Sequence, residues 1–155
     1  MCAVKNKIEK YIDKLWNKEW QSSTKILHTK QIIPRNHKSK KLTKFILTKS
    51  KYEIKNIVEW ITGHGSLNKN QFYLGHSNTK LCRICMADDE TPNHIMMSCP
   101  GTEQIRLRET LLNKSKTIRF DNNNYIWTDD YLTLTKIEYI VKCIKETKTH
   151  LSWEL

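Results

Sequence analysis

The chain has 155 residues, the length of one domain or of one domain with an extended arm. Its mean hydropathy is −0.65 and 38% of its residues are hydrophobic, so we expect a modest core. No run of about 18 apolar residues occurs, which excludes a transmembrane helix. The first residues lack the apolar stretch of a secretory signal, so we expect an intracellular protein, in the nucleus or the cytoplasm.

The net charge of +11 is concentrated in the first 60 residues. Residues 1–60 contain 15 Lys or Arg against 5 Asp or Glu, residues 61–100 contain 3 of each, and residues 101–155 contain 9 against 8. This asymmetry favours a polyanionic partner, with a merely solvated Lys-rich face as the alternative. Only 5 of the 27 basic residues are Arg, so nucleic-acid binding would be mostly electrostatic and weakly sequence-specific.

The first half of the chain is predicted to be helical. Apolar residues at helical spacing from Val4 to Trp20 predict an amphipathic helix over about 3–20. A polar loop follows, and 31–34 is expected to be extended because a residue before proline avoids the helical region. The basic cluster that starts at Arg35 is expected to pass from a loop into a short helix or strand over 42–48.

Capping signals and apolar spacing predict the later elements. Ser50 and Glu53 form a capping-box pattern ahead of a helix over about 51–62, and Ser66 is expected to cap a short helix ending near Gly75. Further helices are expected over about 102–113 and 131–148, with a loop over 116–127. The predicted fold class is mainly α, a small helical domain with little or no sheet.

The most specific pattern is C-x₂-C-x₈-H-x₄-C, formed by Cys82, Cys85, His94 and Cys99. Two thiolates three positions apart can face one point from a tight turn, and a helix of about 92–98 would bring His94 and Cys99 to the same point. We predict one structural Zn²⁺; unmetallated buried thiols and a redox pair are the alternatives. Four side-chain ligands leave no position for water or substrate, so the metal is expected to stabilise the fold rather than to catalyse.

The remaining cysteines and histidines are weaker candidates. Cys2 and Cys143 are expected to be a terminal thiol and a core thiol, and His64 or His76 could replace one of the four ligands. The expected organisation is a basic helical arm or subdomain (1–60), a zinc-knuckle core (61–113), and a loop with a C-terminal helix that packs on the core (114–155).

Several of these stretches resemble one family. The first stretch resembles the W-x-x-E-W-x-x-S-x-K-G segment of non-LTR retrotransposon polyproteins; it is Leu15-Trp16-Asn17-Lys18-Glu19-Trp20-Gln21-Ser22-Ser23-Thr24-Lys25. Further stretches follow in the family's order, over about residues 11–108 in all. They are Ile32-Ile33-Pro34, then Ile61-Thr62-Gly63-His64-Gly65, and then the Cys/His array with Glu90-Thr91, Pro100 and Arg106. In jockey and I-type elements this order closes the reverse-transcriptase polypeptide, after the RNase H domain.

The resemblance has two visible departures. Ile26-Leu27 stands where the family usually has Gly, and Met86 replaces the usual Gly after the second knuckle cysteine. Because that Gly supplies a turn with positive φ, Met86 is expected either to be strained or to alter the knuckle, which bears on metal affinity.

The resemblance implies a non-catalytic, nucleic-acid-binding tail, with RNA or single-stranded DNA as partner. We expect the contacts to come from basic residues: Lys25, Lys30, Arg35, Lys38, Lys40, Lys41, Lys44 and Arg83. Any of four aromatic residues could stack on bases if exposed, although such residues are more often core: Trp16, Trp20, Trp60 and Tyr73.

Other function classes stay open. A structural or protein-interaction module that docks on a reverse transcriptase is the main alternative, and a truncated relic without selected function is another. An enzyme is not expected, because the carboxylate clusters and the Y-x-D-D motif of the related polymerase and nuclease domains are missing.

Overall fold

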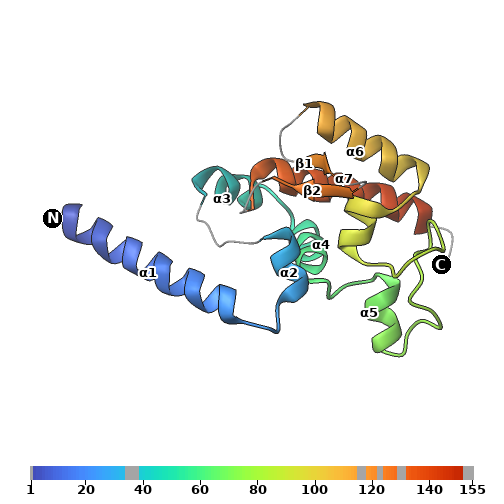
Figure 1. Ribbon diagram of the computed structural model, residues 1–155, viewed down its shortest axis with the longest axis horizontal. Coiled ribbons are helices and arrows are strands. Elements are labelled where there is room, and N and C mark those ends of the chain that lie inside the picture. Colours follow the sequence, from blue (N-terminus) through green and yellow to red (C-terminus); the bar gives the residue numbers. More distant parts are fainter. Residues whose placement is uncertain (1, 34–38, 115–117, 122–123, 129–131, 152–155) are drawn as a thin grey trace.

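The computed structural model describes residues 2–33, 39–114, 118–121, 124–128 and 132–151 (Figure 1). In chain order the elements are α1 (Cys2–Ser22), α2 (Leu27–Ile32), α3 (Lys40–Leu47), α4 (Lys51–Thr62), α5 (Asn68–Tyr73), the π-helix η1 (His94–Ser98), α6 (Thr102–Lys114), β1 (Ile118–Asp121), β2 (Asn124–Trp127) and α7 (Leu134–Leu151). Among the described residues the strands form one antiparallel hairpin, which pairs Ile118 with Trp127. The predicted class, mainly α with little sheet, is confirmed.

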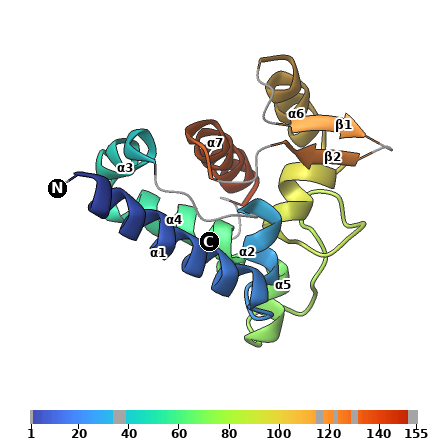
Figure 2. The same cartoon turned by 60° about the vertical axis from the view of Figure 1, so that its left-hand side comes forward.

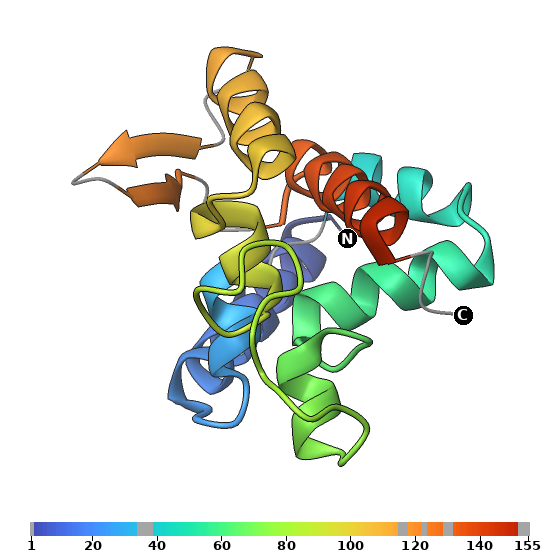
Figure 3. The ribbon, with the colours of Figure 1, turned by 90° about the vertical axis from the view of Figure 1, so that its right-hand side faces the viewer.

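The core is built around α7. This helix packs against α3, α4, α6 and η1, and Figure 3 shows it lying beside α3 and α4. Its buried residues Ile137, Ile140 and Cys143 belong to the same apolar cluster as Ile57 and Trp60 of α4. Cys143 is therefore a core thiol, as expected. No helix in the described part of the chain is long and apolar enough to cross a membrane.

The capping box at the start of α4 is present as predicted. Ser50 Oγ accepts a hydrogen bond from the Glu53 backbone N–H at 3.2 Å, and the Glu53 carboxylate accepts from the Ser50 N–H at 2.9 Å. The bond from the Ser50 N–H and a second bond from the Ser50 hydroxyl, at 3.0 Å, lower the pKa of the Glu53 carboxyl. The helix ends at Gly63, whose φ of +76° is the left-handed conformation that glycine favours at a C-cap.

The amphipathic helix α1 has the predicted extent, but its apolar face is largely exposed. Figure 1 shows it extending from the side of the molecule, with its N-terminal end farthest from the other helices, and in Figure 2 it lies in front of α4. Its large apolar side chains, which such a helix normally buries, are between 40% and 65% exposed: Val4, Ile8, Tyr11, Ile12, Leu15 and Trp16.

Three local expectations are wrong. Helix α2 replaces the extended segment at Gln31 and Ile32. The bias before Pro34 acts on one residue, Ile33, whose φ of −126° and ψ of 78° lie outside the helical region. A β-hairpin occupies part of the expected loop over 116–127, with the rings of Phe120 and Tyr125 4.9 Å apart across the strands. Leu67, rather than Ser66, is the N-cap of α5.

Candidate metal centre

The four predicted ligands lie in one cluster. One donor atom from each of Cys82, Cys85, His94 and Cys99 lies within 4.8 Å of all the others. The Sγ atoms of Cys82 and Cys99 are 4.0 Å apart, and Sγ of Cys85 is 3.3 Å from Nε2 of His94. A tetrahedral ion with bonds of about 2.0–2.3 Å separates two sulfurs by about 3.8 Å and a sulfur from a nitrogen by about 3.6 Å. The cluster could therefore hold a metal ion with small adjustments.

A tight turn presents the first two cysteines. The Cys82 N–H donates to the Asp88 carbonyl at 2.7 Å, and the Met86 N–H donates back to the Cys82 carbonyl at 2.8 Å. Met86 has a φ of +56°, the left-handed conformation that glycine favours. Of the two expected outcomes, strain at Met86 is therefore the one that the structure has.

The π-helix η1 explains how His94 and Cys99 reach the same point. On an α-helix, two side chains five residues apart point about 140° away from each other around the axis. A π-helix bonds residue i to residue i+5, so the same two side chains lie close to one face. The Cys99 N–H donates to the His94 carbonyl at 2.7 Å. Thr91 Oγ1 accepts from the His94 N–H at 3.0 Å and starts the turn. The expected helix over 92–98 is present, but its last five residues, His94–Ser98, form a π-helix.

The second ring nitrogen of His94 also has partners. Nδ1 lies 3.2 Å from Ser98 Oγ and 3.5 Å from an Asp88 carboxylate oxygen. Such a contact on the far side of a ligating imidazole fixes the tautomer and the ring orientation. Nε2 of His94 is thereby directed at the sulfurs.

The cluster without a cation retains protons. A hydrogen bond with Cys99, together with burial, raises the pKa of Cys82 to about 12, and the same bond lowers the pKa of Cys99. Hydrogen bonding to Cys82 and Cys85 outweighs burial and raises the pKa of His94 to about 9. A cation must therefore displace protons to bind here.

Two residues outside the motif donate hydrogen bonds to the backbone of the segment from Ile95 to Cys99. Arg108 of α6 is 3% exposed, and its guanidinium donates to the carbonyls of Ile95 (3.4 Å) and Cys99 (2.5 Å). Tyr139 of α7 donates its hydroxyl to the Met96 carbonyl at 2.7 Å, and burial raises its pKa. The sequence reasoning missed both, although Arg108 falls on the apolar face of the predicted helix with Leu111, which is a signal of a buried charge. Met96 and Met97 are buried in the core.

Arg83, expected to contact nucleic acid, forms an internal ion pair. Its guanidinium lies 2.6–3.2 Å from the oxygens of Glu90, which is 1% exposed, and it also donates to the Ser66 carbonyl at 2.9 Å. Arg83 thus compensates the charge of the buried Glu90.

Five of the other predicted contact residues are described: Lys25 in the turn before α2, Lys30 on α2, and Lys40, Lys41 and Lys44 on α3. Those that are exposed are Lys25, Lys40, Lys41 and Lys44. Lys30 is half-buried, with Nζ bonded to the carbonyls of Gln21 and Ser23 at 2.8 and 2.6 Å. Arg35 and Lys38 lie outside the described residues.

The four aromatic candidates divide into two kinds. Trp16 and Tyr73 are 55% and 66% exposed, whereas Trp60 is 6% exposed and belongs to the core. Trp20 is half-buried and donates its indole N–H to the Ile33 carbonyl at 3.1 Å.

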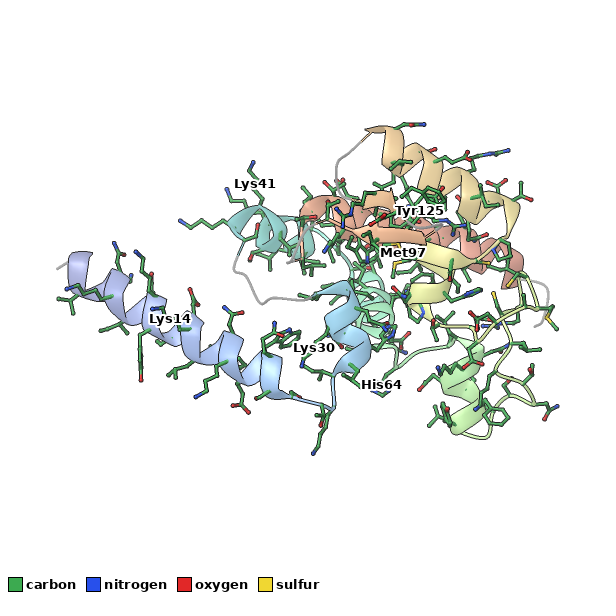
Figure 4. All side chains as sticks on the ribbon, viewed as in Figure 1. Lys14, Lys30, Lys41, His64, Met97 and Tyr125 are labelled. Atoms are coloured by element: carbon green, nitrogen blue, oxygen red, sulfur yellow. The ribbon has the colours of Figure 1, made fainter. Side chains whose placement is uncertain are left out.

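A surface hollow lies between α2, the end of α4 and the knuckle. Its polar lining includes Lys25, His28, His64, Lys69 and Tyr73. Figure 4 shows His64 near the lower end of α2. Burial lowers the pKa of His28. Neither His64 nor His76 belongs to the metal cluster.

Comparison with known proteins adds no relative. Neither a protein-family model, nor a curated protein, nor a solved structure matches the chain.

Proposed function

We propose that this chain is a zinc-stabilised, basic module that binds RNA or single-stranded DNA, related to the non-catalytic tail of non-LTR retrotransposon polypeptides. The observation that carries the proposal is a closed set of four clustered ligands in a chain whose excess positive charge lies in residues 1–60. The metal holds the module together, and the lysines contact phosphates.

Zinc is the ion that this donor set favours. Three thiolates and one imidazole in a tetrahedral arrangement are soft ligands that suit Zn²⁺, whereas iron–sulfur clusters use four cysteines or pairs of histidines. Cys82 and Cys99 are fully buried, which suits a structural ion better than a redox pair that must meet a partner. All four positions are filled by side chains, so the proposed zinc has no catalytic role.

The exposed lysines of α3 are the best-supported phosphate contacts. Lys40, Lys41 and Lys44 lie on one short helix, exposed to solvent, and Figure 4 shows the Lys41 side chain pointing away from the molecule. Lysine is a flexible point charge, so this surface would bind a phosphate backbone with little regard to sequence.

The hollow next to the knuckle is the proposed place for one unpaired base. Tyr73 offers an exposed ring on which a base can stack, and Lys25 lies on the same hollow for a phosphate, whereas Lys69 is paired with Asp89 at 3.1 Å. A base within a duplex cannot reach such a ring, so this arrangement favours single strands.

The salt dependence of binding tests the α3 surface. The double variant K41Q/K44Q removes two proposed phosphate contacts, so the slope of log K against log salt for single-stranded RNA should become shallower by about 1.4. Fluorescence anisotropy over a salt series measures it, with zinc content determined on the same samples.

A matched variant separates local contacts from net charge. R106Q/R119Q removes the same two charges from α6 and β1, where the guanidinium groups lie 3.3 Å from Glu103 and 3.7 Å from Asp121. Its slope should equal that of the unmodified chain. Equal changes in both double variants, or no binding at low salt by zinc-loaded protein, would contradict the proposed surface.

Replacing Tyr73 tests the base site. Base stacking contributes about 1–3 kcal/mol, so Y73A should weaken single-strand binding about tenfold and leave duplex binding unchanged. Y52A is the control, because Tyr52 of α4 is 64% exposed, close to the 66% of Tyr73, and lies outside the lining of the hollow. Equal losses for the two variants would remove the hollow from the proposal.

A further inference from the structure

The apolar face of α1 is a second surface that the proposed function does not use. Its six large apolar side chains are 40–65% exposed and form a stripe on the order of 600 Å², at the upper end for the largest patch on a monomer. Figure 4 shows Lys14 on this helix, away from the other elements. A stripe of this kind needs a partner.

The spacing within the stripe fits another helix. Val4, Ile8, Tyr11 and Leu15 follow one another at intervals of four, three and four residues, which is the a/d seam of a coiled coil over two heptads. The next d position is Lys18, where the seam ends. Ile12 and Trp16 widen it on one side.

The charges beside the seam favour a second copy of this chain in parallel orientation. The g positions hold Lys7 and Lys14, and the e positions that follow hold Ile12 and Glu19; Lys14 and Glu19 are exposed. In a parallel pair each g position faces the e position five residues further along the partner. Lys14 would then face Glu19 of the second copy.

The antiparallel arrangement is disfavoured by the same charges. There g positions face g positions, so Lys7 would lie against Lys14 of the second copy and repel it. An anionic lipid surface is less well matched, because it favours lysines on both sides of a stripe, whereas one side here carries Glu9 and Glu19.

We propose that two copies of the chain associate through α1 as a parallel two-stranded coiled coil, with Lys14–Glu19 ion pairs between copies. Since α1 joins the other helices at its C-terminal end (Figure 1), the two bodies lie at the same end of the pair. The dimer would present two basic surfaces side by side and so raise affinity for a long strand through effective concentration.

Sedimentation velocity of the zinc-loaded full chain, over a micromolar to submillimolar concentration series, tests the pairing. L15E places a charge in the seam and should abolish the dimer while zinc content stays unchanged. K14E and E19K should each weaken the dimer roughly fivefold, and the double variant K14E/E19K should restore it. K10E, with the same change of charge at a c position, should have no effect.

The contrary results are specific. A chain that stays monomeric throughout, or a dimer that L15E leaves intact, overturns the proposal. A dimer strengthened by K14E shows antiparallel pairing and overturns it as well. A full chain that stays monomeric and binds vesicles of phosphatidylcholine and phosphatidylserine through α1 would assign the stripe to a membrane surface and overturn the proposal. None of these outcomes depends on nucleic-acid binding, so this proposal and the proposed function can fail separately.

Discussion

Met86 shows what a single residue contributes to the knuckle. Its N–H closes the turn onto Cys82, at a φ of +56°, while its side chain is 61% exposed. A left-handed conformation costs a non-glycine residue about 1–2 kcal/mol. The position therefore carries strain that its exposed side chain does little to offset.

Replacing Met86 with glycine should stabilise the protein. M86G relieves the left-handed strain and loses part of that gain to the greater freedom of glycine in the unfolded chain, which leaves about 1 kcal/mol. Denaturant unfolding of the zinc-loaded protein measures this difference. M86A keeps a Cβ at the same φ and should give no gain; equal stabilisation by both variants would rule out backbone strain as the cause.

The ligands were predictable at this scale and the buried charges were not. Cys82, Cys85, His94 and Cys99 are identified by spacing alone, because few sites other than a tetrahedral ion require that pattern. Buried charged residues depend on partners from distant segments. The fully buried Lys136 donates to the Ile32 carbonyl at 3.2 Å, across 104 residues of chain, and no local pattern encodes this contact.

At the scale of elements, η1 depends on helices that follow it in the chain. Tyr139 of α7 bonds the Met96 carbonyl at 2.7 Å within a buried environment. Y139F removes this donor and leaves the carbonyl without it, so the free energy of unfolding should fall by about 1–3 kcal/mol. Chemical denaturation with zinc bound gives the value.

An exposed tyrosine provides the comparison for that prediction. Y52F makes the same chemical change on the 64% exposed side chain of α4 and should alter stability little. If Y139F were as stable as Y52F, the hydrogen bond would not be what holds the π-helix to α7.

The sequence predicted those elements that carry their own signals. The capping box and apolar stripe place α4 at Lys51–Thr62, as expected, and α6 at Thr102–Lys114 within one residue of the expected range. Helix α2 has six residues and no side-chain cap, so its stability comes from burial of Ile32 rather than from local sequence. The hairpin depends on ring contacts such as Trp127 with Tyr139, 5.9 Å apart, which only the tertiary structure provides.

The whole molecule combines a modest core with a candidate metal site. The buried cluster joins α4 and α7 to the knuckle through Ile95, Met96 and the two buried ligand cysteines. Structural zinc contributes on the order of 10 kcal/mol, which is comparable with the total stability of a domain. Loss of the ion is therefore expected to lower the free energy of unfolding of this part of the chain strongly.

Zinc binding and metal-free stability should respond to pH in opposite directions. In the metal-free folded protein the pKa of His94 is about 9, above the reference value of 6.5, so protonation stabilises the fold fully below 6.5 and that contribution is lost as pH rises through 9. Zinc must displace the same proton, and the Cys82 proton with a pKa of about 12, so zinc affinity should rise with pH over this range.

Competition with a chromophoric zinc chelator, and denaturant unfolding with and without zinc, measure the two trends between pH 6.5 and 9. C85S should abolish stoichiometric zinc binding and its pH dependence. C143S changes a buried thiol of α7 outside the cluster, so it should lower stability while retaining one zinc and the same dependence. Zinc affinity that stays constant over this range would mean that neither Cys82 nor His94 gives up a proton on binding, and both would then have to be withdrawn as ligands.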